Sequence, residues 1–147
     1  MSLNEKIVAD LKHAMKAKDS VRLSCLRMLK TSLKLKQVDK GRELEDGEVE
    51  AVITSMVRKA REAIDEFRKG DREDLALSEE QEIKILYEYL PQQLTPDEIE
   101  KTLKEVISEL SAKTPKDLGK VMKTAMAKMA GSAQGKEVNE IARKLLC

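Results

Sequence analysis

The chain has 147 residues, enough for one ordinary domain or two small ones. Aromatic residues make up 2% of it, tryptophan is absent and 37% of the residues are charged, a composition typical of helical bundles with aliphatic cores. The scarcity of aromatic side chains argues against nucleic-acid binding by base stacking, and the charged N-terminal region lacks the apolar run of a signal peptide or membrane span.

Charge is distributed unevenly along the chain, although the net charge is only +1. Residues 1–40 hold 10 basic and 4 acidic residues (net +6), residues 41–112 hold 10 and 20 (net −10), and residues 113–147 hold 8 and 3 (net +5). Two basic ends around an acidic middle favour an anionic partner at one of the ends.

Four helices are expected before residue 91. Capping signals at Ser2 and at Asp19 or Ser20 predict helices that end near Lys18 and Val38. Asp46 begins a third helix, which Gly70 ends and which has the clearest amphipathic pattern, and a fourth covers about residues 71–89. The apolar positions of the first three are Leu3, Ile7, Leu11 and Met15; Val21, Leu23, Leu26, Leu29 and Leu33; and Val49, Val52, Ile53, Met56, Val57, Ala60, Ile64 and Phe67.

Pro91 ends the fourth helix and makes residues 90–94 a short hinge. Thr95, Pro96 and Glu98 then supply an N-cap, a proline at the first helical position and a carboxylate at the third, the strongest helix start in the chain. Three helices are expected after the hinge. We therefore predict an all-α protein of two small bundles, a four-helix domain over residues 1–90 and a three-helix domain over residues 95–147.

The sixth helix and the turn after it form the candidate site. Thr114 and Pro115 begin the helix, whose apolar face consists of Leu118, Val121, Met122, Ala125, Met126 and Met129. Lys116, Lys120 and Lys123 fall on the opposite face, and a turn bounded by Gly131 and Gly135 leads through Lys136 into the seventh helix. A solvated lysine face beside an ordinary helix–helix turn explains the same residues without a ligand. The turn lacks the spacing of a nucleotide-binding phosphate loop and has no strand before it.

Catalytic and metal-binding motifs are not apparent. His13 lies on a polar flank of the first helix, and the helical position of Cys25 predicts a buried, unreactive thiol. The acidic run of Asp71, Glu73, Asp74, Glu79 and Glu80 fits a solvated helix start better than a divalent-ion site. No cofactor is expected, and Cys25 and Cys147, without a disulfide or zinc spacing, indicate a reducing compartment; we predict a cytoplasmic protein.

Four stretches resemble the GatB/YqeY family, and most closely its free-standing YqeY-like members. They are Arg22–Lys30; Arg58–Phe67 followed by Gly70–Leu75; Glu82–Ile83 with Tyr89–Leu94; and the C-terminal pair Leu118–Met122 and Gly131–Val138. Together they span nearly the whole chain in the family's order. Gln134 is a departure, because an acidic residue is usual at that position of the family signature.

The resemblance implies an all-helical protein of four helices and then three. It also implies kinship with the C-terminal tail of the GatB subunit of the glutamyl/aspartyl-tRNA amidotransferase, a tail that helps bind tRNA, and through it a grouping with carbon–nitrogen ligases that use glutamine as amido-N-donor. The catalytic parts of that enzyme have no counterpart in these residues. We therefore expect a non-catalytic protein that binds tRNA or associates with the amidotransferase or other translation components; the alternative is a protein–protein adaptor without an RNA ligand.

The residues expected to contact nucleic acid share either a positive charge or a glycine that lets an anion approach the backbone. They are Lys116, Gly119, Lys120, Lys123, Gly131, Gly135 and Lys136.

Overall fold

The computed structural model describes residues 2–147, and these contain seven α-helices, one 3-10 turn and no strand. The all-α prediction is confirmed. By its internal contacts the chain divides into two compact units, Met1–Leu90 and Pro91–Cys147. No helix among residues 2–147 is long and apolar enough to cross a membrane.

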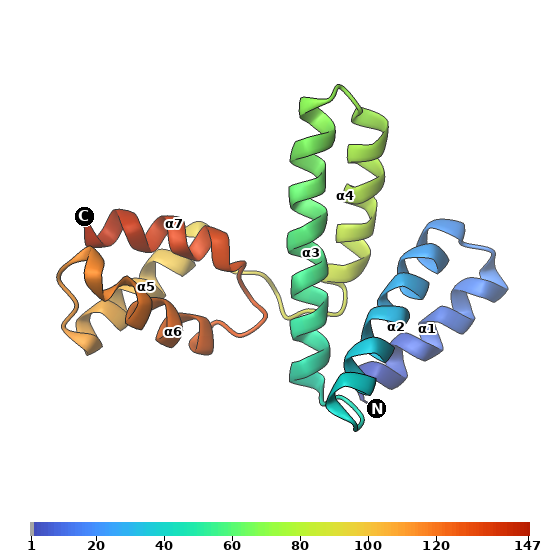
Figure 1. Ribbon diagram of the computed structural model, residues 1–147, viewed down its shortest axis with the longest axis horizontal. Coiled ribbons are helices and arrows are strands. Elements are labelled where there is room, and N and C mark those ends of the chain that lie inside the picture. Colours follow the sequence, from blue (N-terminus) through green and yellow to red (C-terminus); the bar gives the residue numbers. More distant parts are fainter. Residues whose placement is uncertain (1) are drawn as a thin grey trace. The chain divides into compact units, whose positions relative to one another are not determined.

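The N-terminal unit consists of two helical hairpins (Figure 1). Helix α1 packs along α2 in one hairpin, and α3 packs along α4 in the other. The capping signals act as predicted, since the Ser2 hydroxyl accepts a hydrogen bond from the Glu5 N–H at 3.1 Å and the Asp19 carboxylate accepts one from the Arg22 N–H at 3.2 Å. The four helices are α1 Leu3–Ala17, α2 Ser20–Lys40, α3 Asp46–Lys69 and α4 Glu73–Tyr87.

The core of this unit follows the predicted apolar stripes, although some stripe residues are only half-buried against it, namely Leu3, Leu23, Val52, Met56 and Phe67. Two further residues of the stripes are exposed. Met15 and Val21 were expected on the inner faces of α1 and α2, but they are 52% and 44% exposed. The reason is angular: at about 100° per residue, Val21 lies roughly 140° around α2 from the buried Leu26. Ala14 takes the inward position that was assigned to Met15.

The end of the N-terminal unit is held by polar contacts. Glu88 accepts two hydrogen bonds from the Arg22 guanidinium, at 2.5 and 3.1 Å. The Tyr89 hydroxyl donates to the Asp10 carboxylate at 2.6 Å. These bonds connect the residues after α4 to α1 and α2. The chain up to Leu90 is therefore part of the N-terminal unit.

The C-terminal unit packs three α-helices around an aliphatic core. Thr95 caps α5, with its hydroxyl accepting from the Glu98 N–H at 3.2 Å, and Pro96 occupies the first turn as expected. The inward positions recur every three or four residues on each helix: Ile99, Leu103 and Val106; Val121, Ala125 and Met129; Val138, Ala142 and Leu146. The elements are α5 Pro96–Leu110, the 3-10 turn η1 Pro115–Asp117, α6 Leu118–Lys128 and α7 Gly135–Leu146.

Candidate nucleic-acid interface

The start of the predicted sixth helix differs from the prediction. Residues from Pro115 were expected to be continuously α-helical, but Pro115–Asp117 form a 3-10 turn before α6 begins at Leu118. The Asp117 carboxylate accepts hydrogen bonds from the Lys113 N–H at 3.1 Å and the Thr114 N–H at 3.4 Å, and these bonds hold the pKa of Asp117 below its usual value. The carboxylate thereby tightens the first turn into i→i+3 bonding.

The three lysines of the stripe lie as predicted on the solvent side. Lys116, in η1, and Lys120 and Lys123, in α6, are exposed, and none forms an ion pair with any residue of 2–147. Lys128, on the same helix, differs, because its ammonium group contacts both carboxylate oxygens of Glu109 on α5, at 2.8 and 2.9 Å. The stripe lysines are therefore without an ion pair in the described chain, although Lys120 lies near enough to Asp117 to help lower the pKa of that carboxyl, whereas Lys128 is paired with Glu109.

The turn between α6 and α7 is held by its carbonyl groups. The Gly131 carbonyl accepts from the Gln93 side chain at 2.8 Å, and the Ser132 carbonyl accepts from the Leu94 N–H at 2.8 Å. Gly131 has φ 74°, a left-handed conformation that strongly favours glycine. Gln93 and Leu94, which lie in the segment predicted to be a hinge, thus fix the conformation of the turn at Gly131 and Ser132.

Helix α7 begins at Gly135, at the end of the predicted turn, and its N-terminus lacks a side-chain cap. Gln134 occupies the N-cap position, yet its side chain makes no capping bond and is buried, with 6% of the residue exposed. Its Nε2 has no hydrogen-bond partner among residues 2–147. The first N–H groups of α7 consequently retain their capacity to donate to an anion.

Two of the three candidate glycines are not required by packing. A Cβ added to Gly119 or Gly135 would meet no atom within 4 Å, and neither residue has a positive φ. Neither side-chain packing nor a left-handed backbone therefore requires glycine at these two positions, which lie in the first turns of α6 and α7. Open space over the backbone of Gly119 is next to Lys120 in α6.

The structure brings some of the predicted site residues together and separates others. Lys116, Gly119, Lys120 and Lys123 lie along η1 and the first half of α6, whereas the Gly131–Lys136 turn follows the other end of that helix. Gly131 lies eight positions after Lys123 along mostly helical backbone, which corresponds to about 12 Å along the axis. A single extended ligand could contact both parts; one small anion could not.

Three further exposed and unpaired cations within residues 113–147 were not assigned to the site. Lys113 precedes η1, and Arg143 and Lys144 lie in the last turns of α7. None of them forms an ion pair with any residue of the described chain. In the sequence, these three residues are indicated by the net charge of +5 over residues 113–147, to which they contribute.

Cys25 and part of the acidic run, which were considered for catalysis and metal binding, are buried or paired with neighbouring side chains. Cys25 is 2% exposed, which confirms the predicted burial, and this burial raises the pKa of its thiol to about 12, as expected of an unreactive cysteine. Of the acidic run, Glu73 and Glu80 pair with Arg68 at 3.2 and 2.5 Å, and Asp74 pairs with Arg72 at 3.2 Å. No group of three or more potential metal ligands lies together among residues 2–147.

Several yeast proteins are similar to this chain over most of its length. Altered inheritance of mitochondria protein 41, mitochondrial, from Lachancea thermotolerans is 33% identical over 109 residues, which cover 72% of this chain and 58% of the yeast protein. The protein of the same name from Vanderwaltozyma polyspora is 30% identical over 107 residues (71% and 58%), and that from Kluyveromyces lactis is 33% identical over 110 residues (72% and 59%). The chain thus matches less than two thirds of the length of these relatives.

The names of these relatives contradict the cytoplasmic localisation predicted from the sequence, because each is designated mitochondrial. That prediction rested on free cysteines and on the absence of an apolar N-terminal run. Neither feature separates the cytoplasm from the interior of an organelle, since mitochondrial targeting segments are amphipathic and charged rather than continuously apolar.

The similarity to a family extends over nearly all of the chain. The family model described as Yqey-like protein matches residues 4–146, which include every helix but the first residue of α1. This match agrees with the four resembling stretches in the sequence, and the chain therefore belongs to the Yqey-like protein family.

Proposed function

We propose that this protein binds tRNA without catalysing a reaction on it, and that the contact surface is the lysine stripe of η1 and α6 together with the Gly131–Lys136 turn. In this proposal the first four helices and the last three form separate bundles, and the second bundle carries the RNA site. The observation that carries the proposal is that Lys116, Lys120 and Lys123 are all exposed and have no ion pair among residues 2–147.

Electrostatics favours a polyanion at this surface. Helix α5 holds five acidic and two basic residues, whereas residues 113–147, which include α6 and α7, hold eight basic and three acidic ones, so the positive charge of this unit is concentrated after α5. A phosphate backbone is a long, regularly charged ligand, and it can contact both the stripe and a turn about 12 Å further along α6. Contacts of this type are largely independent of base sequence.

The glycines support the same surface. Gly119 and Gly135 have free space where a Cβ would stand, and in RNA-binding sites such space lets phosphate groups approach backbone N–H groups. The uncapped N-terminus of α7 offers such N–H groups next to Lys136. The family's kinship with the tRNA-binding tail of the amidotransferase GatB subunit makes tRNA the first RNA to test and the amidotransferase the first protein complex.

The proposal is tested by charge reversal in the full-length chain. The variant Lys116→Glu/Lys120→Glu/Lys123→Glu should retain the circular dichroism spectrum, because all three side chains are exposed, and should lose binding of total tRNA in a filter assay at about 0.1 M salt. The matched control is Lys12→Glu/Lys16→Glu/Lys101→Glu, which changes the net charge equally at exposed positions of α1 and α5.

The two variants distinguish a site from a general charge effect. The control should keep tRNA binding to within about threefold, because long-range attraction between exposed charges is screened beyond about 10 Å at 0.1 M salt. A stripe variant that folds and binds tRNA like the unmodified protein would refute the proposal. Equal loss in both variants would show non-specific attraction.

A further inference from the structure

A stripe of exposed apolar side chains runs along the outer face of α2. Val21, Met28 and Leu35 are spaced by seven residues, and Val38 extends the stripe by one turn. They are 44%, 55%, 68% and 74% exposed, although the opposite side of the same helix is buried in the core. Seven-residue spacing places side chains along the seam between two packed helices. This α2 stripe is about 25 Å long.

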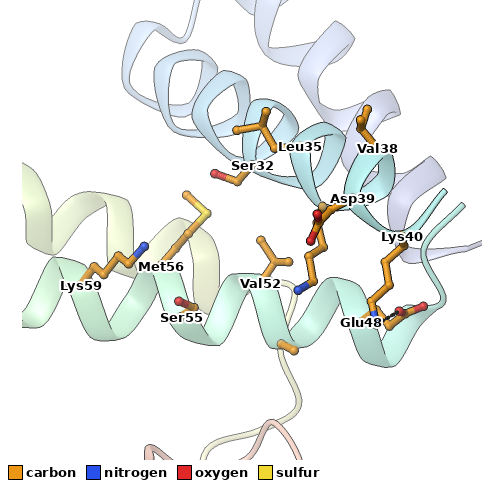
Figure 2. A pocket seen from close by; sticks show the side chains of 12 residues that line it. Ser32, Leu35, Val38, Asp39, Lys40, Glu48, Val52, Ser55, Met56 and Lys59 are labelled. Carbon is orange, nitrogen blue, oxygen red and sulfur yellow. Dashed lines mark ion pairs between the residues drawn. The ribbon is translucent and has the colours of Figure 1, made fainter. Parts of the chain in front are cut away.

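A groove of about 770 Å³ opens beside the α2 stripe, between α2 and α3. Leu35 and Val38 line it from α2, and Val52 and Met56 of α3 point toward α2 across it (Figure 2). Val52 and Met56 are only half-buried, although their positions on the predicted apolar face suggested full burial. Aliphatic side chains at its walls make the groove suitable for the apolar face of another helix.

The surroundings of the α2 stripe are basic. At about 100° per residue, Arg27 and Lys34 flank Leu35 on one side of α2 and Lys36 flanks it on the other. Lys59 lies at the facing wall of the groove, on α3. All four side chains are exposed and none forms an ion pair within residues 2–147.

The acidic residues nearby do not neutralise this surface. Glu48, which lines the groove, forms ion pairs with Arg42 at 2.7 Å and with Lys40 at 3.6 Å. Asp39 is the remaining carboxylate of the groove. Glu79 and Glu82 line an adjoining hollow of about 310 Å³ together with Met28, Met56 and Lys59, so acidic side chains border the site at Met28.

From this pattern we propose that the groove between α2 and α3 and the α2 stripe bind an amphipathic helix of another protein, one with aliphatic residues on its buried face and carboxylates on both flanks. The aliphatic residues would cover Met28, Leu35 and Val38, and the carboxylates would reach Arg27 and Lys34 on one side and Lys36 and Lys59 on the other. This site lies in the N-terminal unit and does not depend on the tRNA proposal.

Charge decides between this occupant and the others. A second copy of the chain, docking through its own α2, would place Arg27, Lys34 and Lys36 against the same cations and would be repelled. An RNA backbone would pair with the cations but would leave the aliphatic side chains between them without an apolar partner. An acidic amphipathic helix satisfies both the charge and the apolar surface.

Two synthetic peptides of about 20 residues test the proposal with the full-length chain. Both present leucines at heptad positions; one has glutamates and the other lysines at the flanking positions. Fluorescence anisotropy should show binding of the glutamate peptide, with the lysine peptide at least about tenfold weaker. The variant Met28→Ser/Leu35→Ser should weaken the glutamate peptide at least about tenfold, because it removes two exposed apolar contacts.

Matched controls and competing occupants complete the experiment. Met15→Ser/Leu77→Ser removes two side chains of similar exposure (52% and 49%) on α1 and α4 and should leave peptide affinity unchanged. The proposal is overturned if the glutamate peptide does not bind, if both peptides bind equally, or if Met28→Ser/Leu35→Ser has no effect. It is also overturned if sedimentation shows a dimer that this variant dissociates, or if tRNA displaces the glutamate peptide.

Discussion

Cys25 illustrates how burial of a single group links stability to pH. The folded protein keeps the thiol protonated, since burial raises its pKa to about 12, whereas in the unfolded chain a cysteine ionises near pH 8.5. Above about pH 8.5 the unfolded state therefore binds fewer protons than the folded state, and stability falls as pH rises, by at most about 1.4 kcal/mol per pH unit.

Urea denaturation between pH 7.5 and pH 9.5 measures this effect. The protein should lose roughly 1 kcal/mol over this interval, and Cys25→Ala should lose less, although its overall stability is lower because of the cavity. Cys147→Ala is the matched control, since Cys147 is exposed, and it should keep the full slope. The same slope in Cys25→Ala as in the unmodified protein would contradict the account.

Gln134 carries a buried amide that contributes no hydrogen bond through its Nε2. Burying an amide nitrogen without a partner costs about 1–3 kcal/mol, and no capping bond would be lost on its removal. We expect Gln134→Met to leave the free energy of unfolding unchanged or to raise it by up to about 1 kcal/mol. Gln81→Met, at an exposed position of α4, is the control and should have no effect. A loss above about 1 kcal/mol for Gln134→Met, measured by urea denaturation, would reveal a partner such as a bound water.

At the scale of elements, helix α6 contains a glycine that its own packing does not need. Gly119 is the second residue of α6, and a Cβ there would meet no atom within 4 Å. Gly119→Ala should therefore stabilise the fold by about 0.5 kcal/mol, because alanine has the higher helix propensity. If phosphate approaches this backbone, the same change should weaken tRNA binding.

Gly47→Ala is a closely matched control for Gly119→Ala. Gly47 is also the second residue of its helix, α3, and it also has free space where an added methyl group would lie. It should show the same gain in thermal stability with no change in tRNA affinity. Reduced tRNA affinity in Gly47→Ala, or unchanged affinity in Gly119→Ala, would count against the glycine as part of the site.

Helix starts were predictable where a local side chain makes the cap. Ser2, Asp19 and Thr95 each form the expected bond to a backbone N–H two or three residues beyond the helix start, and such bonds depend only on nearby sequence. The 3-10 turn at Pro115–Asp117 was not predicted, because it depends on which of several N–H groups the Asp117 carboxylate accepts from. Local patterns do not fix that choice.

At the scale of the molecule, residues that are distant in sequence set features that periodicity cannot show. The anchoring of Gly131 and Ser132 by Gln93 and Leu94 joins segments 38 residues apart. The exposed stripe of α2 was likewise not predicted, since the sequence alone does not distinguish Val21 from the apolar residues on the buried face of an amphipathic helix. The candidate lysines were identified from sequence because exposed positions opposite an apolar face follow directly from helical spacing.

The two compact units predict separable domains. A fragment of residues 91–147 should be helical by circular dichroism and should melt cooperatively, because it retains its own core. A fragment of residues 95–147 should be less stable, since it lacks the Leu94 N–H bond to Ser132 and the Gln93 bond to Gly131. A random-coil spectrum for residues 91–147 would contradict independent folding, and equal stability of the two fragments would show that residues 91–94 are dispensable.

The salt dependence of tRNA binding tests the central claim most directly. Each phosphate contact contributes about 0.7–0.9 to the magnitude of the slope of log K against log salt. If the three stripe lysines contact the RNA backbone, the full-length protein should therefore show a negative slope with a magnitude of about 2 or more. Lys116→Glu/Lys120→Glu/Lys123→Glu should bind too weakly to measure or show a slope smaller in magnitude by about 2–3, while Lys12→Glu/Lys16→Glu/Lys101→Glu should keep the original slope. Equal slopes for the unmodified protein and a folded stripe variant would contradict the assignment of this surface to RNA.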